Sequence, residues 1–211
     1  LVASAVQAMT NVVRIPITVK CRIGIDNQDD YPFLSRFIET VAEAGCQHFI
    51  IHARKAWLNG LSPKENREIP PLDYHRVYQI KQQFPQLHIS INGGITTLDT
   101  AEHQLAQLDG VMIGREAYHN PYLFAEVDQR FYGKAGTPPT RFEVLEQLYP
   151  YIQKQLQAGA RLNYITRHIL GLFQGIPGAR AWRRYLSEHA HKTNAGLSVI
   201  QHAASLIHTE K

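Results

Sequence analysis

This sequence has few cysteines and no long apolar run, and both features exclude whole classes of protein. Among its 211 residues there are only two cysteines, Cys21 and Cys46, with neither a CxxC motif nor a Cys/His ligand spacing. This argues against a zinc site and a disulfide framework. No apolar run approaches the length of a membrane span, and the first residues lack the basic-then-apolar order of a signal peptide. We therefore expect a soluble, cytoplasmic protein without a metal site.

Charge is unevenly distributed along the chain. Residues 1–140 carry 13 Lys and Arg against 14 Asp and Glu, a balance of −1, whereas residues 141–211 carry 9 against 4, a balance of +5. A basic C-terminal part indicates a polyanionic partner, most simply a nucleic acid, although a solvated basic surface explains the same numbers.

The first part of the chain alternates strand and helix patterns. Short apolar runs begin near residues 15, 49, 89 and 110, and each is followed by residues with helical periodicity. Such alternation predicts parallel strands joined by right-handed crossovers, and short apolar strands are typical of a sheet that is buried on both faces.

The stretch His88–Arg115 ends two consecutive strands in glycine. The first strand stops at Asn92-Gly93-Gly94 and the second at Gly114-Arg115. In a (β/α)₈ barrel the loops after strands seven and eight commonly form a phosphate pocket, and Arg adds a bidentate clamp. Tight turns and a helix cap are the alternative. If the loops hold phosphate, the chain is the C-terminal half of a TIM barrel, and four βα units would precede Leu1.

After the α/β part the pattern becomes entirely helical. We predict a barrel half over residues 1–132, a Gly/Pro/Thr linker over 133–141 and a small all-α bundle over 142–211. Three bundle arginines are spaced i, i+3 and i+4, which places them on one helical face, and Trp182 and Tyr185 lie beside them. Arginine with aromatic residues suits RNA contact, although a Trp and a Tyr on a bundle helix are more often core residues. The three arginines are Arg180, Arg183 and Arg184.

Lys20 and His52 stand at the carboxyl ends of their strands, which is the face where barrel enzymes keep their sites. A lysine that closes an apolar strand could neutralise an anionic ligand, or it could pair with an acidic neighbour. His52 could equally be a hydrogen-bonded structural residue. Cys21 alternates with Lys20 and should point toward the helices, so we interpret both cysteines as packed thiols.

A long polar loop, 53–71, follows His52. Its basic residues and its tryptophan could hold a nucleic acid over the barrel mouth, and loops of this length are usually functional or disordered. The candidates for contact are Arg54, Lys55, Trp57, Asn66 and Arg67. An ordinary solvated loop is the alternative for the second half of this segment.

Several ordered motifs together resemble the FMN-dependent tRNA-dihydrouridine synthases. They are Val19-Lys20 with Arg22-Ile23-Gly24, Ile51-His52-Ala53-Arg54, Ser90 to Ile95, and Ile113-Gly114-Arg115-Glu116. The loop Ala53 to Trp57, the run Ser62 to Tyr74 and the segment Leu172 to Arg180 resemble bacterial subfamily A. The resemblance covers essentially the whole chain.

The resemblance implies an FMN barrel with a C-terminal tRNA-binding domain. It places Lys20 and His52 at the flavin ring system and ribityl side, and Asn92, Gly93 and Gly94, with Gly114 and Arg115, around the FMN phosphate. In this family NADPH reduces the flavin, hydride passes to the C5=C6 bond of a uracil, and subfamily A acts on uridines of the tRNA D-loop. A base in folded RNA must be splayed out to reach such a site.

The family's proton-donor cysteine matches neither Cys21 nor Cys46, and we expect it upstream of Leu1. No catalytic residue is therefore assigned within this chain, and we expect the 211 residues alone to be inactive or nearly so. An open half barrel exposes strand edges, so we also expect self-association.

Two other functions remain open from the sequence. One is an FMN-dependent barrel oxidoreductase that acts on a small molecule such as dihydroorotate, which leaves the basic tail unexplained. The other is a non-catalytic tRNA-binding fragment, which would bind no flavin.

Overall fold

The computed structural model describes residues 1–208 of the chain, which form two compact units. The units are Leu1–Gly114 and Arg115–Lys211. The division between the compact units follows Gly114, which is earlier than the expected barrel limit at residue 132. The expected domain limits of 1–132, 133–141 and 142–211 remain a prediction. None of the helices among the described residues is long and apolar enough to cross a membrane.

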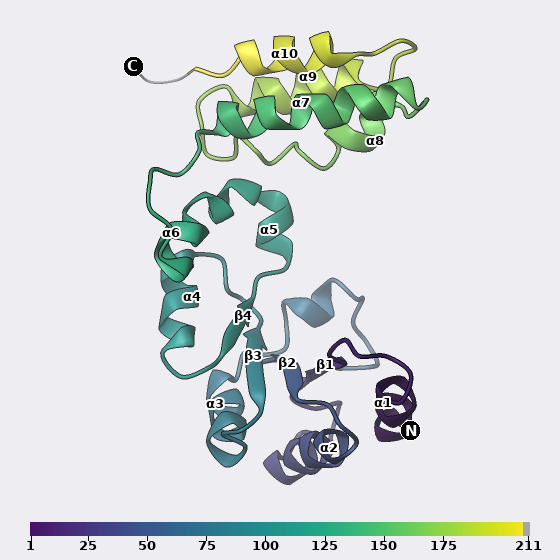
Figure 1. Ribbon diagram of the computed structural model, residues 1–211, viewed down its shortest axis with the longest axis vertical. Coiled ribbons are helices and arrows are strands. Elements are labelled where there is room, and N and C mark those ends of the chain that lie inside the picture. Colours follow the sequence, from purple (N-terminus) through teal and green to yellow (C-terminus); the bar gives the residue numbers. More distant parts are fainter. Residues whose placement is uncertain (209–211) are drawn as a thin grey trace. The chain divides into compact units, whose positions relative to one another are not determined.

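The first unit is built on one sheet of four parallel strands in the order β1-β2-β3-β4 (Figure 1). The strands are β1 (Thr18–Arg22), β2 (His48–His52), β3 (His88–Asn92) and β4 (Gly110–Met112), each parallel to its neighbour. The unit also contains α1 (Val2–Thr10), α2 (Tyr31–Glu43), η1 (Glu65–Arg67), α3 (Tyr74–Gln83) and α4 (Leu98–Leu105). The parallel α/β class expected for half a TIM barrel is thus confirmed.

Alternation along the strands separates an apolar face from a polar one. Phe49, Ile51, Ile89 and Ile91 are fully buried, and α3 and α4 pack beside β3 and β4. Because successive side chains of a strand point to opposite faces, the residues that alternate with these four along β2 and β3 lie on the other face of the sheet. That face carries the polar side chains of the site.

The first strand begins later than the sequence predicts. The β-branched run from Ile15 predicts a strand start near residue 15, but β1 starts at Thr18. Ile15 is 71% exposed, and Pro16 has no N–H to donate to a ladder. These residues therefore form the connection into the strand.

The second unit is helical. It contains α5 (Arg115–His119), η2 (Pro121–Glu126), α6 (Val127–Tyr132), α7 (Arg141–Gln157), α8 (Leu162–Thr166), α9 (Ala179–His189) and α10 (Leu197–Ser205). In Figure 1, α7, α9 and α10 lie side by side, and contacts join α10 to both α7 and α9.

Trp182 and Phe173 form the centre of the helical core. Both are completely buried, and their rings meet edge to face with centroids 4.9 Å apart. Trp182 is therefore a core residue and not a stacking platform for bases. At the start of this bundle Thr140 and Glu143 form a capping box, which satisfies the first amides of α7.

The sequence predicts helices over 121–131, over 162–173, and over 142–157 with an interruption at Tyr149-Pro150, and the structure differs at all three. The helix expected over 121–131 is split into η2 and α6, and that expected over 162–173 ends at Thr166. In contrast, Pro150 does not interrupt α7, which continues to Gln157.

Candidate functional site

Polar side chains share one row at the carboxyl edge of the sheet. Arg22 is in register with His52, His52 with Asn92, and Asn92 with Met112. Since register partners in a parallel sheet lie side by side, three strands each contribute a polar group to the same edge. Asn92 reinforces the row, because its Nδ2 donates a hydrogen bond of 2.8 Å to the carbonyl oxygen of Met112.

The turn after β3 requires both of its glycines. Gly93 has φ +121° and Gly94 has φ +69°, a region that favours glycine. A Cβ on Gly93 would lie 2.8 Å from Cδ2 of His52, and one on Gly94 would lie 2.6 Å from Cδ1 of Leu72. Tyr74 fixes the turn by donating a hydrogen bond of 2.7 Å from its hydroxyl to the oxygen of Gly93. The main chain therefore approaches the buried His52 ring closely.

Lys20 lies one row below Arg22 and on the same face of β1, since the two are two positions apart. Its side chain is exposed on the sheet, and within the described residues it forms no ion pair. Partial burial, reinforced by the neighbouring Arg22 charge and opposed by Cys21, lowers the pKa of Lys20. A partly desolvated cation without a carboxylate partner is suited to an anionic ligand.

The predicted phosphate loops are only partly brought together in the first unit. Gly93, Gly94 and Gly114 belong to it, and the amides of Gly94 and Gly114 donate no hydrogen bond among the described residues. Arg115 is the first residue of α5 and belongs to the second unit. Its proposed role therefore rests on the sequence alone.

Arg22 is the site residue that the sequence analysis did not select. Its Nη1 donates hydrogen bonds of 2.9 Å to the carbonyl oxygens of both Lys55 and Asn66, so it holds the long loop against β1. Burial, and then the charges of Arg54 and Arg67, lower its pKa from the usual high value. The signal was present, because Arg22 follows Lys20 at the two-residue spacing that defines one strand face.

Several predicted RNA contacts in loop 53–71 also fix the loop itself. Nη1 of Arg54 donates to the oxygens of Glu68 and Pro70, and Nζ of Lys55 lies 2.8 Å from Oδ2 of Asp29. The amide group of Asn66 bonds the main-chain N–H and oxygen of Trp57. These residues thus hold an ordered loop at the rim of the site. Whether they also contact RNA stays a prediction.

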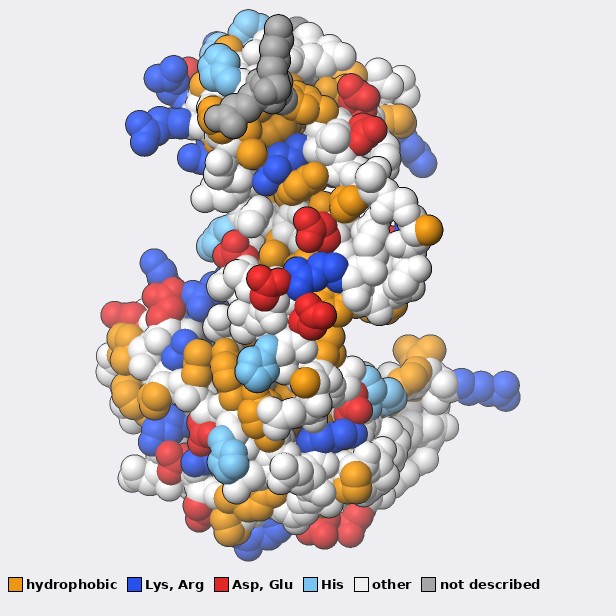
Figure 2. All heavy atoms as spheres, turned by 90° about the vertical axis from the view of Figure 1, so that its left-hand side faces the viewer, with side chains coloured by type: hydrophobic (Ala, Val, Ile, Leu, Met, Phe, Trp, Pro, Cys, Tyr) orange, Lys and Arg blue, Asp and Glu red, His pale blue; other side chains and the backbone are white. Residues whose placement is uncertain are grey.

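Of the three arginines on α9, Arg180 and Arg184 are exposed. Arg183 is half-buried, and its Nη1 donates a hydrogen bond of 3.2 Å to Oε1 of Gln174. Tyr185 stacks on His189 with ring centroids 4.0 Å apart, which leaves it less available to a base. Figure 2 shows separate Lys and Arg side chains over the helical unit.

The donor set at the sheet edge fits a phosphorylated, aromatic cofactor. It consists of a lysine ammonium, an imidazole, an amide and unused main-chain N–H groups, all of which suit anionic or carbonyl oxygens. Among the described residues, no group of three or more His, Cys, Asp and Glu side chains could hold a metal ion. The lysine, imidazole, amide and main-chain N–H groups can together bind a phosphate and position an aromatic ring.

A family model described as "Dihydrouridine synthase (Dus)" matches residues 1–208. The chain belongs to the dihydrouridine synthase family. Enzymes of this family are flavin-dependent and modify tRNA.

Relatives named "tRNA-dihydrouridine(20/20a) synthase" are similar over nearly the whole chain. The protein from Shewanella oneidensis is 62% identical over 210 residues, which cover 100% of this chain and 63% of that protein. Those from Vibrio cholerae and Escherichia coli K12 are each 60% identical over 208 residues, 98% of this chain and 64% and 60% of those proteins. The chain thus spans about three fifths of the length of these relatives.

Proposed function

We propose that the protein containing this chain is a tRNA-dihydrouridine synthase that reduces uridines of the D-loop to 5,6-dihydrouridine. The observation that carries the proposal is the row of Arg22, His52 and Asn92 beside the Gly93-Gly94 turn, in a chain of the dihydrouridine synthase family. A tRNA substrate also assigns the reaction to the cytoplasm.

The cofactor of this proposal is FMN. When bound and reduced by NADPH, it would supply the hydride for the C5=C6 bond of a uracil. Lys20 and His52 would contact the ring system and ribityl side, while Asn92, Gly93, Gly94 and Gly114, with Arg115, would hold the phosphate. Within residues 1–208, Lys20 forms no ion pair and the amides of Gly94 and Gly114 donate no hydrogen bond, which supports this division of roles.

Loop 53–71 would contribute to substrate binding at the site rim. Arg54, Lys55, Trp57, Asn66 and Arg67 come from this loop, and its internal hydrogen bonds give it a defined conformation. A preformed loop loses less conformational entropy when RNA binds than a flexible one would. The bundle, with Arg180, Arg183 and Arg184, would hold another part of the tRNA.

The decisive experiment measures dihydrouridine formed by the complete gene product that contains this chain. With FMN, NADPH and unmodified tRNA transcripts, we expect dihydrouridine in the D-loop and none when NADPH is omitted. A protein that binds FMN and oxidises NADPH with dihydroorotate, but leaves the tRNA unchanged, would refute the proposal. A protein that binds tRNA without a flavin absorbance band would refute it as well.

A further inference from the structure

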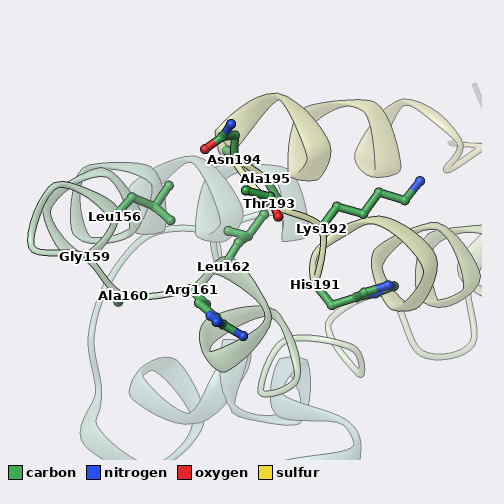
Figure 3. Close-up of a pocket in the computed structure, with 11 residues that line it drawn as sticks. Leu156, Gly159, Ala160, Arg161, Leu162, His191, Lys192, Thr193, Asn194 and Ala195 are labelled. Carbon is green, nitrogen blue, oxygen red and sulfur yellow. The ribbon is translucent and has the colours of Figure 1, made fainter.

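A cavity lies in the helical unit, among residues that the sheet-edge site does not include. It is a cavity of about 580 Å³ between the turn after α7 and the turn that joins α9 to α10 (Figure 3). Arg161 comes from the first turn, and the run His191 to Gly196 comes from the second. None of the sheet-edge residues Lys20, Arg22, His52 and Asn92 lines this cavity.

Both walls of the cavity are held by tight turns. After α7, Gly159 adopts φ +88°, and the amide of Ala160 donates to the oxygen of Gln155. After α9, the amide of Ala195 donates to the oxygen of Lys192, and Asn194 adopts φ +63°. Non-glycine residues rarely take positive φ, and Asn does so more readily than most. The cavity is thus formed by the local fold and not by a loose loop.

The lining is basic and polar. Arg161, His191 and Lys192 contribute cationic or ionisable nitrogens, Thr193 and Asn194 contribute polar groups, and none of the eleven described lining residues is acidic. Within the described residues, neither Arg161 nor Lys192 forms an ion pair. Their charges are therefore available to an anion from outside.

The helix that begins at the cavity adds to this positive field. α10 starts after Gly196 with no side-chain cap and no acidic residue in its first turn. The amide end of a helix carries a partial positive charge, which here is not neutralised by a carboxylate. This adds to the attraction that the cationic side chains of the cavity provide.

The cavity continues the arginine face of α9. At 3.6 residues per turn, Arg180, Arg184, Ser187 and His191 fall within about 60° around the helix axis. His191 follows the end of α9, and its Nδ1 donates a hydrogen bond of 3.0 Å to the oxygen of Ser187, which keeps it on this stripe. The stripe is roughly 16 Å long, enough to pass several consecutive phosphates of one RNA strand.

We propose that this cavity binds a backbone phosphate of the tRNA, several nucleotides away from those held by the α9 arginines. The inference rests on the proposed function, because it takes tRNA as the anion. Arg161 and Lys192 supply the charges, and Thr193 and Asn194 supply hydrogen bonds to phosphate oxygens. Contacts of this kind fix the register of the RNA but read no base.

The test measures tRNA binding by the complete gene product at several salt concentrations. The double substitution Arg161→Gln with Lys192→Gln should weaken binding roughly tenfold and reduce the slope of log affinity against log salt by about one, since one lost phosphate contact removes about one released counterion. In turnover assays KM for tRNA should rise while kcat stays unchanged, because a backbone phosphate contact contributes to binding and reads no base.

Two matched variants serve as controls. One tests whether any loss of positive charge weakens binding, and the other tests whether substitution at the cavity disturbs folding. Arg14→Gln with Arg36→Gln removes the same charge from exposed residues of the first unit and should leave the slope within error of wild type. Arg161→Lys with Lys192→Arg keeps both charges and should bind within about twofold of wild type. If this charge-preserving variant loses as much affinity as the neutral one, the residues are structural and the proposal is wrong.

The outcomes also distinguish this inference from the proposed function. If wild type binds tRNA and the Arg161→Gln, Lys192→Gln variant matches the Arg14→Gln, Arg36→Gln control in affinity and slope, only the cavity proposal fails. If wild type binds tRNA with the expected slope change in the variant but forms no dihydrouridine, only the enzymatic proposal fails. If wild type does not bind tRNA, both fail.

Discussion

A substitution at Gly114 can test a role in cofactor binding separately from a role in stability. It does not have a positive φ, and a Cβ on it would meet no described atom within 4 Å. Gly114→Ala should therefore change the free energy of unfolding by no more than about 0.5 kcal/mol. If the FMN phosphate approaches this amide, the added methyl group should weaken FMN binding roughly tenfold, or ~1.4 kcal/mol. Urea unfolding and quenching of flavin fluorescence measure the two quantities.

Gly93 provides the contrasting substitution. Gly93→Ala places a Cβ against the His52 ring and Leu72 at φ +121°, so we expect a loss of about 1–3 kcal/mol of stability in addition to weaker FMN binding. Gly60→Ala, at φ +83° with no atom within 4 Å, gives the cost of backbone strain alone. Unchanged FMN affinity in Gly114→Ala would remove Gly114 from the phosphate site.

The lowered pKa of Lys20 predicts a pH dependence of stability that can be measured in the absence of cofactor. Its pKa in the folded protein is lowered, mainly by burial, so the unfolded chain binds more protons between that lowered pKa and 10.5. The contribution of Lys20 to stability therefore rises with pH in this window, whereas the raised pKa values of Cys21 and Cys46 lower the total stability over alkaline pH. Lys20→Met removes only this contribution, so the stability of wild type should rise relative to that of the variant between neutral and alkaline pH. The substitution should keep stability at pH 7 within about 0.5 kcal/mol and weaken FMN binding.

Urea unfolding of wild type and Lys20→Met at neutral and alkaline pH checks this prediction. Lys134 is a suitable control residue because its pKa is raised by a surface contact with Asp128, which is the opposite direction. For Lys134→Met, the stability of wild type should therefore fall relative to that of the variant as pH rises. A destabilised Lys20→Met at pH 7 would show that Lys20 has a structural partner instead of a ligand.

At the scale of a helix, the arginine face of α9 distinguishes a tRNA substrate from a small one. Charge reversal of Arg180, Arg183 and Arg184 to Glu should reduce turnover on tRNA roughly 100-fold or more, because three phosphate contacts become repulsive. Turnover of a small substrate should barely change. Arg183 also bonds Gln174, so the Arg180→Glu, Arg184→Glu pair, which leaves that bond intact, excludes an effect of misfolding. Equal losses on both substrates would contradict a role in RNA binding.

Helix and strand types could be predicted from periodicity, whereas their ends depend on contacts that periodicity does not contain. The strand pattern from Ile15 could not show that this residue is exposed outside the sheet. The helical pattern of 162–173 continues past Thr166, but the chain turns there, and a Cβ on Gly171 would collide with the carbonyl oxygen of His119. Such a close approach is set by packing within the helical unit, between α5 and the segment after α8, which leaves no trace in local spacing.

The candidate site shows the same limit. Lys20, His52 and the glycine turns could be predicted because strand ends and glycines have a fixed meaning in parallel α/β folds. The role of Arg22 in tethering loop 53–71 joins residues that are 33 and 44 positions apart. A hydrogen bond to a distant main-chain oxygen depends on the three-dimensional path of the loop, so one sequence could not reveal it.

At the scale of the whole molecule, the sheet leaves two outer strands. In the order β1-β2-β3-β4, the described strands β1 and β4 each have a partner on one side only, and the face that carries Lys20 is exposed on β1. An outer strand presents unpaired N–H and C=O groups that can pair with another chain. This is the physical basis for expecting the 211-residue chain to self-associate.

Sedimentation velocity over a range of concentrations tests this expectation, and species larger than the monomer should increase with concentration. Thr18→Lys, on the exposed edge of β1, should reduce association, because a charge on an edge strand opposes pairing with a second edge. Thr96→Lys, in the exposed loop after β3, adds the same charge away from an edge and should leave association unchanged. A sharp monomer at every concentration would show that the edges do not pair. An equal effect of both substitutions would show that net charge, and not strand pairing, controls association.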